Sequence, residues 1–134
     1  MKNVLIIEDN KMMAQILAQL LRNSVQPQTL LYAGSTNQAE AIFAKSKLVG
    51  YSLDCVFLDL NLNVPLDGLP LLTQIKQDFP DLPVIIVTAE NEMETVKKVI
   101  SHKPDGYIVK PLSMKKLNQC LEKVHQSRQL NAEN

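Results

Sequence analysis

The sequence has no net charge, few cysteines and no long apolar segment, and each absence excludes a class of protein. Fourteen basic residues balance fourteen acidic ones, which argues against general electrostatic binding of nucleic acid or anionic membrane. Cys55 and Cys120 lie far apart with no Cys or His nearby at metal-ligand spacing, so neither a disulfide framework nor a zinc site is expected. No apolar run approaches the roughly 20 residues of a membrane span, and the apolar stretch 4–7 is too short for a signal peptide. We expect a cytoplasmic protein with neither direct nucleic-acid nor membrane partners.

Length and composition predict a single globular domain. The chain has 134 residues, of which 46% are hydrophobic, enough to form a core without disulfides. We place the domain at residues 1–124. Residues 125–134 are polar, and they either extend the last helix or begin a linker.

Short apolar runs alternate along the chain with amphipathic segments. The runs, each typical of a strand buried on both faces, are residues 4–7, 29–33, 55–58, 84–87 and 106–109. The segments between them have helical spacing of apolar residues; the first stripe includes Ile16 and Leu17, and the fourth includes Met93, Val99 and Ile100. This order predicts an α/β fold, (βα)5, with a doubly wound parallel sheet of five strands covered by helices on both faces.

Polar residues follow four of the predicted strands. Glu8 and Asp9 follow the first strand, Asp59 the third, Thr88 ends the fourth, and Lys110 follows the fifth. Ligands of open parallel sheets collect beyond the carboxyl ends of the strands. We therefore expect these five side chains at one edge of the sheet.

These residue types suit a single reaction. Clustered carboxylates favour a cation between them, and Mg²⁺ takes oxygen ligands. Asp59 can attack a phosphoryl donor as a carboxylate nucleophile, while the metal and Lys110 offset charge and the Thr88 hydroxyl donates to a phosphoryl oxygen. Taken singly, each residue has an ordinary explanation as a helix cap, a loop residue or a solvated side chain. That explanation needs four coincidences at four strand ends, so we favour formation of an aspartyl phosphate.

Four motifs resemble the receiver domain of two-component response regulators over residues 3–124. They are Glu8-Asp9, Asp54-x-x-x-x-Asp59, Thr88-Ala89 and Lys110-Pro111. Each is weak alone, but the combination is specific. The resemblance implies a flavodoxin-like sheet with strand order 2-1-3-4-5.

The resemblance assigns a phosphoacceptor and a metal site. Asp59 corresponds to the phosphoacceptor. Glu8, Asp9, Asp59 and the backbone carbonyl of Asn61 correspond to the ligands of Mg²⁺, with Mn²⁺ as an alternative ion.

It also assigns a switch. Thr88 and Tyr107 correspond to a pair in which the hydroxyl moves toward the phosphoryl group and the ring turns inward. Lys110 would contact the phosphoryl oxygens, and the bond before Pro111 is expected to be cis.

The implied partners are proteins. The phosphoryl donor would be a phosphohistidine on a sensor histidine kinase or histidine phosphotransfer protein. A downstream effector would bind the surface formed by the fourth helix, the fifth strand and the fifth helix. We expect a stand-alone receiver that catalyses its own phosphorylation and dephosphorylation and is not otherwise an enzyme.

The chain departs from the family pattern in one segment. The step from Asp59 to Gly68 is one residue longer than the common pattern, so its loop is expected to bulge. Asn61 and Glu90 occupy positions that resemble the family's sites for tuning the phosphoryl lifetime.

Three alternatives stay open. A haloacid-dehalogenase-like phosphatase also uses an Asp nucleophile with Thr, Lys and Mg²⁺, but it has Asp where this chain has Asn61. A receiver-like module that binds its partner without phosphorylation would not need the full residue set. A nucleotide-binding fold would need a glycine-rich turn in place of Glu8-Asp9-Asn10-Lys11.

Overall fold

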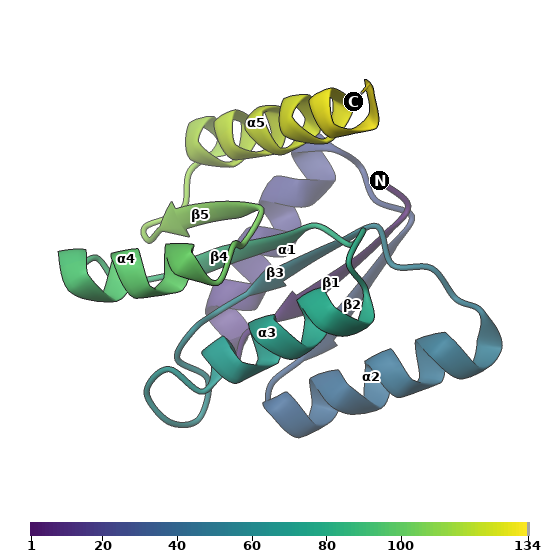
Figure 1. The fold of residues 1–134 in the computed structure, drawn as a ribbon, viewed down its shortest axis with the longest axis horizontal. Coiled ribbons are helices and arrows are strands. Elements are labelled where there is room, and N and C mark those ends of the chain that lie inside the picture. The colour runs from purple at the N-terminus through teal and green to yellow at the C-terminus, as the bar shows by residue number, and fades with distance from the viewer. Residues whose placement is uncertain (134) are drawn as a thin grey trace.

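The computed structural model describes residues 1–133, with side chains as far as Arg128, and contains a parallel five-stranded sheet whose strands alternate with helices. The strands are β1 (Asn3–Ile7), β2 (Thr29–Ala33), β3 (Cys55–Leu58), β4 (Val84–Thr88) and β5 (Gly106–Val109). The helices are α1 (Lys11–Ser24), α2 (Thr36–Val49), α3 (Gly68–Asp78), α4 (Met93–Ser101) and α5 (Met114–Glu133) (Figure 1). The predicted (βα)5 order is confirmed.

The strand order is β2-β1-β3-β4-β5, as the resemblance implied. The chain passes from β1 out to β2 and returns to β3 on the other side of β1. Ile7, the last residue of β1, pairs with Ala33 of β2 and Leu58 of β3. The carboxyl ends of these strands are therefore level at the point where the chain changes direction, which is where ligands of open α/β sheets bind.

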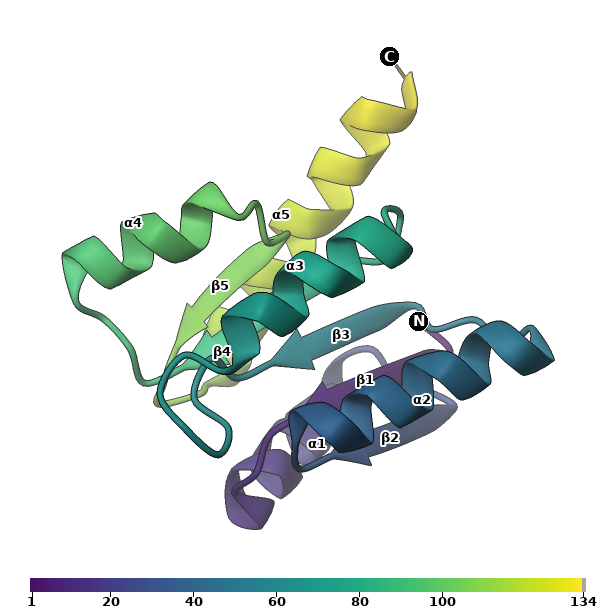
Figure 2. The same cartoon turned by 60° about the horizontal axis from the view of Figure 1, so that its bottom comes forward.

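Helices cover both faces of the sheet. Helices α1 and α5 lie on one face, and α2, α3 and α4 lie on the other (Figures 1 and 2). Each face has its own apolar cluster. One is centred on Phe57 with Leu17, Leu21 and Leu117, and the other contains Leu58 with residues of α2 and α3. This two-sided burial explains why the strands are apolar throughout.

Two helices bury less of their apolar stripe than the spacing predicted. In α4, which lies at the margin of its layer in Figure 2, Val99 is buried whereas Met93 is 67% and Ile100 50% exposed. In α1, Ile16 is 41% exposed because the small residues Ala14 and Ala18 face the sheet instead. Spacing shows which residues share a stripe, but the neighbouring elements decide how much of it they cover.

Helix α5 continues through Glu133, so residues 125–133 of the predicted tail extend the helix; Asn134 lies outside the described residues. Arg128 fixes this extension to the body: one guanidinium nitrogen donates to the carbonyl of Asp81, and another lies 3.0 Å from a carboxylate oxygen of Asp105. Asp105 also accepts from Lys76 at 2.8 Å. Within residues 1–133, none of the helices has the length and apolar character that crossing a membrane requires.

Candidate functional site

The carboxyl ends of the strands bring the predicted residues to one edge. Glu8 follows β1, Asp59 follows β3 and Lys110 follows β5, while Thr88 is the last residue of β4. Asp59 and Thr88 are buried, with exposed fractions of 7% and 0%. Asp9 is exposed. The site therefore combines two buried groups with one open to solvent.

Glu8, Asp9 and Asp59 form a carboxylate cluster. One carboxylate oxygen from each lies within 4.8 Å of the other two. The pairing of Ile7 with Leu58 explains the cluster, because it places the residues that follow β1 and β3 side by side. An all-oxygen donor set of this kind, open on one side, fits a hard divalent cation such as Mg²⁺.

Lys110 holds two of these carboxylates together. Its Nζ lies 2.6 Å from Oε1 of Glu8 and 3.1 Å from Oδ2 of Asp59, and the peptide bond to Pro111 is cis. Burial raises the pKa of Glu8 from 4.5 to about 7, and the Asp59 charge adds to this, although the hydrogen bond from Lys110 opposes it. Burial alone would lower the pKa of Lys110, but the hydrogen bond to Glu8 and the charge of Asp59 outweigh burial and raise it. The ammonium therefore stays charged and offsets the clustered negative charge.

Asn61 contacts Asp59 through its backbone. Its N–H donates to Oδ1 of Asp59 at 3.2 Å. Its side-chain oxygen is turned into the loop, where it accepts from the N–H of Leu66 at 2.8 Å. The side chain of Asn61 is thus engaged away from the cluster.

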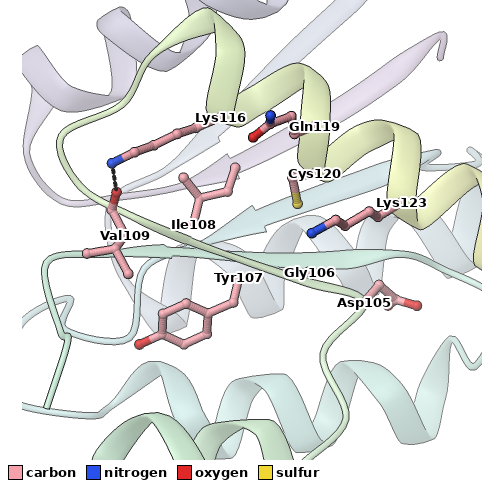
Figure 3. Close-up of a pocket in the computed structure, with 9 residues that line it drawn as sticks. All are labelled: Asp105, Gly106, Tyr107, Ile108, Val109, Lys116, Gln119, Cys120 and Lys123. Carbon is pink, nitrogen blue, oxygen red and sulfur yellow. Dashed lines mark hydrogen bonds between the residues drawn. The ribbon is translucent and has the colours of Figure 1, made fainter. Parts of the chain in front are cut away.

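Thr88 and Tyr107 are connected through the backbone of Glu90. The Thr88 hydroxyl oxygen accepts from the Glu90 N–H at 3.4 Å, and the Tyr107 hydroxyl donates to the Glu90 carbonyl at 2.9 Å. The Tyr107 ring points away from α5 in Figure 3 and packs against the apolar cluster under α3. Burial, followed by the charges of Glu90 and Asp59, raises the pKa of the Tyr107 hydroxyl. In this structure the ring is already directed inward.

A groove runs between β5 and α5 (Figure 3). It has a volume of about 450 Å³, and its lining includes Tyr107 from β5 and Lys116, Gln119 and Lys123 from α5. The Nζ of Lys116 donates to the carbonyl of Val109 at 3.0 Å. The groove therefore presents lysines beside an edge strand.

The roles of two residues near Asp59 were not predicted from the sequence. Asp67 accepts hydrogen bonds from three backbone N–H groups of the loop that precedes α3. Gly68 packs directly against the backbone of Asp59. The sequence signal was the long segment from Asp59 to Gly68. It indicated that the loop bulges, but not which contacts stabilise the loop.

Comparison with known proteins agrees with this geometry. Residues 4–122 match the response regulator receiver domain. The chain is 31% identical over 125 residues to the chemotaxis protein CheY of Pseudomonas aeruginosa, which covers 90% of this chain and 94% of CheY. It is 32% identical over 127 residues to the transcriptional regulatory protein CitT of Halalkalibacterium halodurans, which covers 95% of this chain and 54% of CitT. The chain thus spans about half the length of CitT, and it covers 18% of the response regulator ORR25 of rice.

Comparison with solved structures finds proteins with the same fold. The CheX-CheY-BeF3-Mg²⁺ complex of Borrelia burgdorferi contains a chain that is similar with a TM-score of 0.78 and 27% identity, over 92% of this chain and 89% of that one. A receiver domain protein of Clostridium thermocellum has the same fold, with a TM-score of 0.79 at 23% identity over 97% of this chain and 98% of that one. Sequence, topology and the polar edge of the sheet agree, and the chain belongs to the family of receiver domains of two-component response regulators.

Proposed function

We propose that this chain is a phosphorylation-controlled switch in which Asp59 accepts a phosphoryl group from a phosphohistidine. The donor is a sensor histidine kinase or a histidine phosphotransfer protein. The observation that carries the proposal is the surrounding of Asp59: a buried carboxylate, contacted by Lys110 at 3.1 Å and clustered with Glu8 and Asp9.

Glu8, Asp9, Asp59 and the backbone carbonyl of Asn61 would hold Mg²⁺, or Mn²⁺ in its place. When bound, the cation offsets negative charge on the incoming phosphoryl group. The all-oxygen donor set supports this assignment, since oxygen ligands are those that Mg²⁺ prefers.

The transfer itself uses the carboxylate of Asp59. One of its oxygens attacks phosphorus, the P–N bond of the phosphohistidine breaks, and the electron pair of that bond returns to the imidazole nitrogen. Lys110 lies beside the carboxylate before the reaction, so its ammonium is in place to contact phosphoryl oxygens without a large movement. Hydrolysis of the aspartyl phosphate later resets the chain, which otherwise acts on no separate substrate.

The signal leaves the site through Thr88. Its hydroxyl donates to a phosphoryl oxygen once the group is attached, and this movement alters the hydrogen bond with the Glu90 N–H. Because Tyr107 bonds to the carbonyl of the same residue, the change reaches β5. Phosphorylation then favours the inward position of the ring over an outward one.

The surface that responds consists of α4, β5 and α5, where an effector protein would bind. Met93 and Ile100 of α4 are exposed apolar residues, and Lys116 and Lys123 of α5 line the groove of Figure 3. Exposed apolar residues on one of these helices and lysines on the other are the kinds of side chain that a protein partner can contact. The free thiols of Cys55 and Cys120 suit a reducing compartment such as the cytoplasm.

The proposal is tested by covalent labelling. Wild-type protein, incubated with acetyl phosphate and Mg²⁺, is expected to gain one phosphoryl group by intact-mass spectrometry, and Asp59→Asn is expected to gain none. Asp54→Asn is the matched control: Asp54 precedes the same strand at its far end and accepts from the backbone of Lys2 and Asn3. It should be labelled like wild type.

Other outcomes separate the alternatives. Labelling that persists in Asp59→Asn contradicts the assignment of the acceptor. Repeated turnover of a phosphomonoester favours the phosphatase. Partner binding that is unaffected by beryllofluoride and by Asp59→Asn favours a module that works without phosphorylation.

A further inference from the structure

The loop that joins β3 to α3, residues 59–67, closes around the side chain of Asp67. One carboxylate oxygen of Asp67 accepts from the N–H of Leu62 at 2.7 Å. The other accepts from Asn63 at 3.0 Å and from Val64 at 3.4 Å. Although the loop has one residue more than the usual pattern, it is held from within by a single carboxylate.

A second side chain ties the loop at the end nearer the carboxylate cluster. The side-chain oxygen of Asn61 accepts from the N–H of Leu66 at 2.8 Å, and Leu66 has a φ of 60°, in the left-handed region that non-glycine residues seldom adopt. The backbone of Asn61 also donates to the Asp59 carboxylate at 3.2 Å. The contacts that fix the shape of the loop therefore also fix the position of Asn61, whose backbone carbonyl we propose as a metal ligand.

Gly68 connects this loop to the backbone of Asp59. Its N–H donates to the carbonyl of Leu60 at 2.9 Å. A Cβ on Gly68 would lie 2.3 Å from the carbonyl oxygen of Asp59 and 3.0 Å from the Cα of Leu60. These neighbours are backbone atoms, which cannot rotate away as a flexible side chain can. The first turn of α3 thus approaches the backbone of Asp59 and Leu60 so closely that no side chain fits between them.

We propose that Asp67 and Gly68 are positioning residues for the phosphoacceptor site: Asp67 holds the shape of the loop, and Gly68 lets the start of α3 pack against the backbone of Asp59. Together they set where the Asp59 carboxylate and the Asn61 carbonyl stand relative to Glu8. This proposal rests on the proposed function, because it gives both residues a role in the same phosphorylation site.

The expected displacement follows from the contact distance. A Cβ tolerates neighbours no closer than about 3.0 Å, so an alanine at position 68 must move the Asp59 carbonyl or α3 by at least 0.7 Å (3.0 − 2.3). A misplacement of about 1 Å can slow a reaction by roughly 100-fold when geometry controls it, and a shift of at least 0.7 Å in the backbone of Asp59 is close to that size. Loss of an outer contact that orients metal ligands weakens metal binding by roughly 10-fold or more.

The test compares glycine-to-alanine variants in the full chain. Gly68→Ala is expected to weaken Mg²⁺ binding, measured by calorimetry with Mg²⁺ alone, by roughly 10-fold. It should slow labelling by acetyl phosphate at saturating Mg²⁺ by roughly 100-fold. In the metal-free protein it should also shift the ¹H–¹⁵N signals of Leu60 and Asn61. This last readout is independent of phosphorylation.

Two other glycines give matched controls. Gly50→Ala strains a residue with a φ of 70° but meets nothing within 4 Å, so it should lower stability and leave Mg²⁺ binding and labelling at wild-type values. In Gly34→Ala the new Cβ makes only an ordinary contact, at 3.5 Å from Gln38, so this substitution should change neither Mg²⁺ binding nor labelling. A folded Gly68→Ala protein with wild-type Mg²⁺ affinity and labelling overturns the proposal for Gly68. An equal loss in Gly50→Ala overturns it too, since the effect would then be one of stability.

Variants of Asp67 test the positioning role of this loop even if the Gly68→Ala protein does not fold. Asp67→Ala removes the acceptor of three N–H groups and should weaken Mg²⁺ binding by roughly 10-fold. Asp67→Asn keeps one acceptor oxygen and should be intermediate, whereas wild-type Mg²⁺ affinity in Asp67→Ala overturns the role of Asp67. Failure of the proposed function is seen separately, as wild-type protein that is never labelled or Asp59→Asn protein that still is.

Discussion

Removal of the charge of Lys110 should destabilise the metal-free protein, and by an amount that depends on pH. Lys110→Met keeps most of the apolar stem but leaves Glu8 and Asp59 facing each other without a cation. At an effective dielectric constant of about 20, the attraction of Lys110 is about 6 kcal/mol to Glu8 at 2.6 Å and about 5 kcal/mol to Asp59 at 3.1 Å. Desolvation cancels much of this attraction. The net expectation is the loss of about 3–5 kcal/mol that follows when one partner of a buried ion pair is removed.

The pH dependence follows from Glu8. With Lys110 present the pKa of Glu8 is about 7, and Lys110 is one of the groups that lower it, so in Lys110→Met the pKa of Glu8 should lie higher. Below that pKa the carboxyl holds a proton and the repulsion left by the substitution is relieved. Above it, both Glu8 and Asp59 carry charge. The loss of stability should therefore be smaller on the acid side of pH 7 and increase as the pH rises above 7. Mg²⁺ should restore part of it by replacing the missing cation.

The assay is urea unfolding followed by circular dichroism, on both sides of the Glu8 pKa and with or without Mg²⁺. Lys47→Met is the control, because Lys47 forms an exposed pair with Asp78 at 3.6 Å; its removal should change stability by less than about 1 kcal/mol at either pH. A loss for Lys110→Met no larger than for Lys47→Met, or one that is equal on both sides of pH 7, would refute the reasoning.

Two further predictions concern stability. Because the folded pKa of Glu8 lies above its unfolded value of 4.5, the native state binds more protons, and its stability without metal should fall as pH rises from 4.5 to about 7. Glu8→Gln should remove this fall in thermal melts across that range, and an unchanged slope would contradict the assignment. Arg128→Ala should lower the free energy of unfolding by about 1–2 kcal/mol, because Asp105 loses a charged hydrogen bond. In the same urea titration Lys123→Ala should have little effect, and equal stabilities of the two variants would argue against the Arg128 contact.

The position of the main site residues could be predicted because parallel strands impose it. Glu8, Asp59 and Lys110 each follow a strand, and the carboxyl ends of all strands in such a sheet meet at one edge. Spacing in the sequence was therefore enough to bring together groups that are as many as 102 positions apart. Their hydrogen bonds could not be predicted this way, because they depend on side-chain conformations.

The role of Gly68 and the exposure of α4 could not be predicted. The contact of Gly68 with the backbone of Asp59 depends on how closely α3 approaches β3, which no spacing encodes. Likewise, Met93 and Ile100 share a stripe with Val99, but the neighbouring elements cover Val99 and leave the other two open. In both cases the missing information was the distance between elements.

The contacts of Glu90 have a consequence for how this region can vary. Thr88 and Tyr107 reach only main-chain atoms of Glu90, one its N–H and the other its carbonyl. Both contacts are therefore available to any residue at this position except proline, which has no N–H. The side chain at position 90 can therefore change in charge or size while the connection between the two hydroxyls is kept.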